Sequence, residues 1–122
     1  MMIPFLMASF LVAIPDQAIL DEARVLGRDM AMGQICEVIQ VATFDGDAVM
    51  QSAEALISRG QTAGVSEQAI NDAAEQAHNQ LMADLETQHP SGNEDAAIAQ
   101  LTKSCNELIT SRPAYFSTFK AD

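Results

Sequence analysis

The sequence predicts an all-α fold, a small antiparallel bundle of four to five helices with one disulfide joining the first and last helical segments. Apolar residues recur at helical spacing along most of the 122-residue chain, and short segments rich in Gly, Pro and capping residues separate these runs. Alanine, the strongest helix former, is abundant, whereas Trp is absent and Tyr occurs once. No segment has the alternating pattern of a half-buried strand. A chain of this length is expected to form one domain.

Residues 1–18 are expected to be a signal peptide or an apolar N-terminal helix. The run MMIPFLMASFLVAI is too short to span a bilayer, which needs about 20 apolar residues, and it has the length of a signal-peptide core. Removal as a leader is the favoured interpretation, although no basic side chain precedes Arg24 and Asp16 lies close to the expected cleavage positions. The alternatives are a buried helix and a membrane tether through residues 1–14. The bundle itself is assigned to residues 19–113.

Asp16 directly follows Pro15 and is suited to cap a new helix. Two apolar stripes follow this position. The first stripe comprises Ile19, Ala23, Leu26 and Met30, and the second comprises Ile35, Val38, Ile39 and Ala42. At about 100° per residue, the second stripe is rotated by more than a third of a turn from the first. Because Gly33 lies between the stripes, a kink or a break of the helix is expected there.

The second helix is expected to follow the turn Phe44–Asp47, which ends in a capping residue. Its apolar face comprises Val49, Met50, Ala53, Leu56 and Ile57. Gly60 is its expected end, because glycine readily adopts the left-handed conformation that terminates helices.

The third helix is expected to begin at Ser66, which is suited to be its N-cap. Val65 and Ile70 flank this start at the spacing of a hydrophobic staple. The helix is expected to end before His89–Pro90, because the residue preceding a proline avoids the helical conformation.

The last helix is expected to begin at Ser91–Glu94, which fits a Ser-x-x-Glu capping box, and to end at Pro113. The remaining residues, 114–122, form a C-terminal tail. Its aromatic side chains are Tyr115, Phe116 and Phe119. We expect these rings to fold back and cover an open end of the bundle, since exposed aromatic surface is unfavourable.

The two cysteines, Cys36 and Cys105, lie far apart in the sequence and are expected to form a disulfide. Both fall on or beside apolar stripes of their helices, so both are expected to face inward. Closing so long a loop stabilises a fold by about 4 kcal/mol in the chain-entropy description. A disulfide and a leader both indicate an oxidising compartment, so a periplasmic or secreted location is favoured. The alternative is a cytoplasmic protein with two buried free thiols.

The net charge of −11 excludes some classes of partner. Nucleic acids and anionic membrane surfaces are recognised through Lys and Arg clusters, so neither is expected to bind. Solubility through charge repulsion is the simplest interpretation of the acidic composition. The alternative is a basic protein partner that is steered to an acidic face.

Two Glu-x-x-His patterns are the strongest candidates for metal chemistry: Glu75/His78 and Glu86/His89. This spacing places both side chains on one helix face, as in di-iron bundles. However, both patterns lie on the same predicted helix, about three turns or roughly 16 Å apart, so they cannot share a dinuclear centre. A solvated polar face is therefore the favoured interpretation, and no cofactor is expected. A single surface ion held by Glu75 and His78 is the alternative.

The function favoured by these observations is a small exported binding or structural module without catalysis. No pairing of a nucleophile with a base, and no pair of converging carboxylates, is evident in the sequence. One alternative is an acidic inhibitor, immunity-type or chaperone-like protein that binds a basic partner. A metal-binding helical protein that uses Glu75 and His78 is the other alternative.

Overall fold

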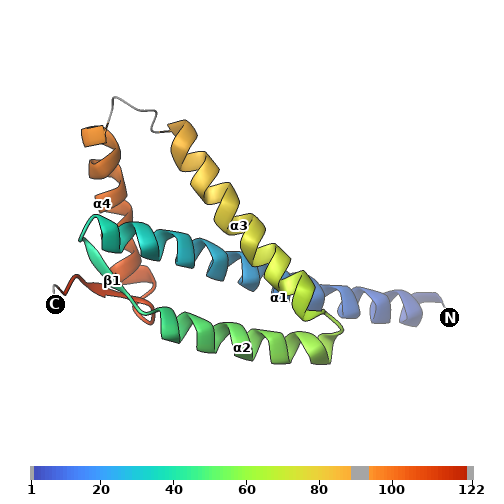
Figure 1. Ribbon diagram of the computed structural model, residues 1–122. Helices are drawn as coiled ribbons and strands as arrows, with labels where there is room; N and C mark the ends of the chain where they lie inside the picture. The colour runs from blue at the N-terminus through green and yellow to red at the C-terminus, as the bar shows by residue number, and fades with distance from the viewer. Residues whose placement is uncertain (1, 89–93, 121–122) are drawn as a thin grey trace.

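The structure is a computed structural model that describes residues 2–88 and 94–120. Its elements, in chain order, are α1 (Met2–Val38), β1 (Ala42–Phe44), α2 (Gly46–Ala63), α3 (Glu67–Gln88), α4 (Glu94–Ser111) and β2 (Phe116–Thr118) (Figure 1). This arrangement confirms the small all-α fold, with four helices among the described residues. The prediction that the chain contains no strand is wrong, because β1 and β2 pair with each other.

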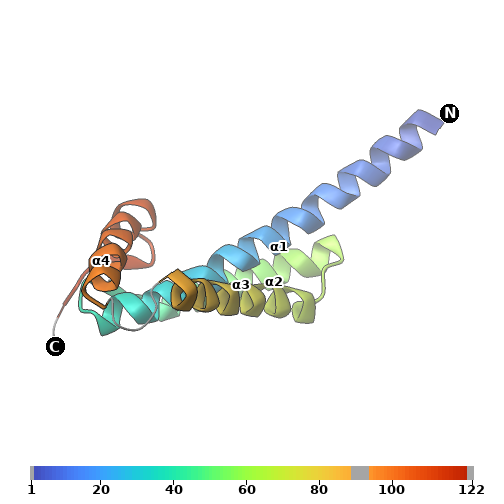
Figure 2. The same ribbon diagram turned by 90° about the horizontal axis from the view of Figure 1, so that it is seen from above.

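Helix α1 is the axis of the molecule. Helices α2 and α3 lie along its middle, α4 lies near its C-terminal end, and its N-terminal part extends beyond the other helices (Figure 2). The helix runs without a break through Pro15, Asp16 and Gly33, so the predicted cap at Asp16 and the predicted break at Gly33 are wrong.

The rotation between the two apolar stripes of α1 has a different cause from the one expected. Most residues of the first stripe belong to a core shared with α2 and α3, whereas Ile39 and Ala42 of the second stripe contribute to a second core at the α4 end. These two residues follow the end of α1 at Val38, which is itself 81% exposed, so the second stripe is not a continuous buried face of the helix. Gly33 is buried against the ring of Phe44, which leaves no room for a Cβ atom at this position.

The larger core lies between α1, α2 and α3. Its buried residues are Ile19, Ala23, Leu26, Val49, Leu56, Val65, Ile70 and Ala73. Helices α1 and α3 approach closely at Gly27, where a Cβ atom would overlap the backbone carbonyl of Ala74. Small residues at this crossing bring the helix backbones together, so a modest number of aliphatic side chains suffices to fill the core.

The ends of α2 differ from the predicted ones. Asp45 is the N-cap, and its side chain accepts a hydrogen bond of 3.0 Å from the amide of Ala48. The helix continues past Gly60, which is buried, and its left-handed C-cap is Gly64, at φ 85°. The prediction of Gly60 as the end is wrong because Gly60 serves packing: a Cβ atom there would clash with the side chain of Ile70.

The predicted ends of α3 agree with the structure. The amide of Ala69 donates a 3.1 Å hydrogen bond to Ser66 Oγ, which confirms the N-cap. Val65 and Ile70 are both buried in the larger core, as the staple requires. Helix α3 ends at Gln88, before His89–Pro90. The predicted capping box begins at Ser91, which lies outside the described residues.

The smaller core contains Cys36, Ala42, Cys105 and Phe116. Strand β2 pairs antiparallel with β1, with Phe116 opposite Phe44, and the two rings are 5.2 Å apart between centroids. The tail therefore folds back onto the end of the bundle, as expected, and Phe116 is buried there. It does so as a strand, because its backbone groups pair with those of β1.

Gly33→Ala tests the packing role of this glycine. We expect overpacking to lower the free energy of unfolding by about 1–3 kcal/mol, because the added methyl group must displace the Phe44 ring. This loss opposes the gain of about 1 kcal/mol that Ala brings to a helix interior. Urea unfolding measures it, with Gly46→Ala as the control, since a Cβ atom at Gly46 would only reach ordinary contact with Phe44. Stabilisation by Gly33→Ala would contradict the packing role.

Candidate functional site

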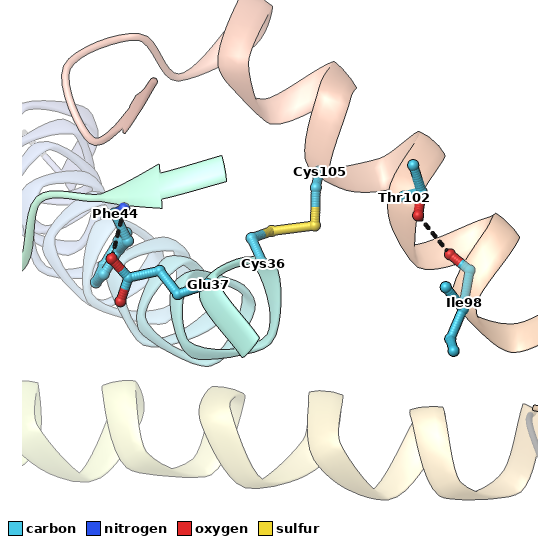
Figure 3. Close-up of a disulfide and its surroundings, with 6 residues drawn as sticks. All are labelled: Cys36, Glu37, Phe44, Ile98, Thr102 and Cys105. Carbon is cyan, nitrogen blue, oxygen red and sulfur yellow. Dashed lines mark hydrogen bonds between the residues drawn. A yellow bond between two sulfur atoms is a disulfide. The ribbon is translucent and has the colours of Figure 1, made fainter. Parts of the chain in front are cut away.

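The disulfide between Cys36 and Cys105 joins α1 to α4 (Figure 3). Its two Cα atoms are 5.8 Å apart across a sequence separation of 69, and both cysteines are fully buried. Cys105 is the one buried residue of α4. Since α4 inserts no other side chain completely into the core, its position depends on this bond and on the strand that follows the helix.

An ion pair between the buried Asp29 and the half-buried Arg112 links α1 to the chain segment after α4. Arg112 donates two hydrogen bonds to Asp29 Oδ2, from Nε at 3.1 Å and from a terminal nitrogen at 2.6 Å. Burial raises the pKa of Asp29 above its ordinary value of 3.8, although the hydrogen bond and the charge of Arg112 act in the opposite direction. The pair therefore carries a desolvation penalty that Arg112 offsets only in part.

The same arginine organises a polar cleft of about 430 Å³ between α1 and α2. Its guanidinium lies over the ring of Tyr115, 5.1 Å from the centroid, and the hydroxyl of Tyr115 is hydrogen-bonded to Ser52 Oγ at 2.6 Å. Arg59 also lines the cleft and is paired with Glu22. Both guanidinium groups thus already have carboxylate partners, so the cleft has no excess positive charge to attract an anion.

An apolar groove of about 380 Å³ lies between α1, α2 and α3. Buried side chains such as Leu26, Leu56 and Ile70 line its interior. Two methionines at the groove are exposed: Met30 from α1 by 37% and Met50 from α2 by 52%. The charged side chains that line it are Glu54 and Glu67, and the lining includes no lysine or arginine. The groove therefore combines an apolar interior with negative charge at its edge.

The residues predicted for metal binding remain on the surface of α3. Glu75 and Glu86 are exposed, and His78 is half-buried with Nδ1 3.4 Å from Asn79 Oδ1. His89 lies outside the described residues. Within residues 2–88 and 94–120, no group of three or more His, Cys, Asp or Glu side chains is arranged to hold an ion. The structure thus adds no third ligand to the Glu75/His78 pair, and an ion bound there stays a prediction.

The cysteine pair was predicted, whereas the ion pair and the groove were not. Asp29 adjoins Met30 of the apolar stripe, and a charged residue at the edge of such a stripe is the signal that could have pointed to it. Its partner Arg112 is far away in the sequence, and no local pattern relates the two. The groove likewise depends on how three helices diverge, which their separate apolar faces do not specify.

Comparisons with known protein families, with curated proteins and with solved structures find no match for this chain. Among the helices in the described part of the chain, none is long and apolar enough to cross a membrane. The features of the molecule that bear on its function are the groove, the disulfide and the net charge.

Asp29→Asn tests whether burial of the charged Asp29 carboxylate lowers the free energy of unfolding. Because burial raises the pKa of Asp29 in the folded state, the folded protein binds more protons than the unfolded chain between pH 3.8 and that raised pKa. The free energy of unfolding of the wild type should therefore fall, relative to the variant, as the pH rises through this window. Urea unfolding of both proteins from below pH 3.8 to neutrality measures the difference. A difference that stays constant, or that grows in favour of the wild type, would contradict the penalty.

Proposed function

We propose that this chain is an exported, non-catalytic binding or structural module that works in the periplasm or outside the cell. The observation that carries this proposal is the Cys36–Cys105 disulfide, together with the dependence of α4 on it. Disulfides form and persist in oxidising compartments, and a small domain gains most from a bond that closes a long loop.

The apolar run at the N-terminus supports export. In the proposal, residues 1–18 are removed as a leader, and the core begins directly afterwards with Ile19 and Ala23, which are both buried. The mature chain would then keep the contacts of α1 with α2 and α3, because these involve Ile19, Ala23 and Leu26.

The surface features of the molecule support a binding function more than a catalytic one. The apolar groove between α1, α2 and α3 offers partly exposed methionines, and flexible methionine side chains adapt to the shape of a partner. The polar cleft between α1 and α2 has its arginines paired with carboxylates. A basic protein partner, favoured by the net charge of −11, is the second candidate.

The intact mass of the chain tests this proposal. The protein is expressed from its own start in a bacterial host with an export pathway, and it is alkylated with and without prior reduction. We expect a chain shortened by about 18 residues that takes up two alkyl groups only after reduction. Alkylation is carried out under denaturing conditions, because both cysteines are fully buried in the folded chain. Cys36→Ser is the control, because its single remaining thiol should then be alkylated without reduction.

Two results would contradict the proposal. A full-length chain with two thiols that are alkylated without reduction would reject both export and the disulfide. A full-length chain that is alkylated only after reduction would reject removal of the leader.

A further inference from the structure

Helices α2 and α3 diverge from their connection at Gly64 (Figure 1), and the apolar groove is lined by residues of both helices and of α1. We propose that this groove binds a basic amphipathic helix of another protein, with apolar side chains in the groove and Lys or Arg side chains at its edge. This inference rests on the proposed binding function and names the surface and the partner.

The apolar part of the partner follows from the lining of the groove. A volume of about 380 Å³ lies within the range of sites that accept ligands, and its interior is formed by aliphatic side chains. The exposed methionines, Met30 and Met50, come from two different helices and flank the same space. Covering them removes apolar surface from water, and their unbranched side chains can repack around a large side chain of the partner.

The basic part of the partner follows from charge. Glu54 of α2 and Glu67 of α3 line the groove, and neither forms an ion pair with any residue that the structure describes. Helix α3, one wall of the groove, carries five acidic residues and no Lys or Arg: Glu67, Asp72, Glu75, Asp84 and Glu86. Cations placed beside these unpaired carboxylates would therefore be attracted to the groove edge.

Charge also argues against a second copy of the chain as the occupant. A symmetric contact through this groove would bring the Glu54 and Glu67 carboxylates of two molecules together, and each molecule carries a net charge of −11. Like charges in close apposition disfavour such a contact.

A helix is favoured as the form of the partner because a helix laid between two diverging helices packs its apolar ridge into their groove.

Methionine methyl NMR tests the site directly. The probe is a synthetic helical peptide of Leu and Lys, with Leu on one face and Lys beside it, and it is added to the chain with the Cys36–Cys105 bond intact. We expect the ¹³C-methyl signals of Met30 and Met50 to shift on titration. Met82, which is also exposed but lies on α3 outside the groove, is the internal control and should not shift. Each signal is assigned from its Met→Leu variant.

Charge variants test the edge of the groove. Replacing both Glu54 and Glu67 by Gln should weaken binding of a fluorescent form of the peptide about fivefold, as expected from the loss of two exposed ion pairs. The matched control replaces Glu75 and Glu86, two exposed acids of α3 outside the groove lining, by Gln and should leave binding close to that of the wild type. Raising the ionic strength should weaken wild-type binding more than binding to the Glu54/Glu67 variant.

Three results would overturn the inference: saturable peptide binding without shifts of Met30 and Met50, equal weakening by both pairs of charge variants, or no binding. Shifts of these methyl signals with protein concentration alone would also overturn it, in favour of a second copy. The test is independent of export. An exported, oxidised chain that fails it leaves the general function standing, whereas a full-length, reduced chain that binds at Met30 and Met50 would overturn export alone.

Discussion

The structure depends most on the covalent link between Cys36 and Cys105. Helix α4 has one buried residue, and that residue is a member of the disulfide. Helices α2 and α3 are different, because each contributes two buried aliphatic side chains to a core that they share with α1. The fold thus consists of three helices held by burial of apolar surface and a fourth element held by an oxidised bond, two short strands and an ion pair.

The ion pair between Asp29 and Arg112 connects these two parts, although burial disfavours the charged form of Asp29. Asp29 lies on α1 between the two cores, and Arg112 reaches it from the segment that leads from α4 to β2. Breaking such a pair on one side leaves an uncompensated buried charge, which is more costly than replacing the whole pair. The arginine also stacks on Tyr115, whose hydroxyl bonds Ser52, so the C-terminal segment is tied to α2 as well as to α1. These contacts position the tail, and none of their residues lines the apolar groove between α1, α2 and α3.

Local chemistry predicted the parts of the fold that depend on a few neighbouring residues. Ser66 was recognisable as a cap from its position before an apolar run, and the cysteine pair from two inward-facing stripes. Strands β1 and β2 were missed because three residues are too short to show alternation, and their pairing joins segments far apart in the chain. The sequence alone does not separate the glycines that serve packing from the glycine that ends a helix. The Phe44 ring packs against Gly33, the Ile70 side chain packs against Gly60, and Gly64 alone among these three has a positive φ.

Hydrogen exchange before and after reduction tests most directly whether the disulfide holds α4 in place. The account predicts that reduction removes protection from the amides of α4 and β2, while the amides of α1, α2 and α3 around the larger core keep theirs. Two results would contradict it. Retained protection of α4 after reduction would show that packing alone holds the helix. Simultaneous loss of protection throughout the chain would show that the three-helix core cannot stand without the bond.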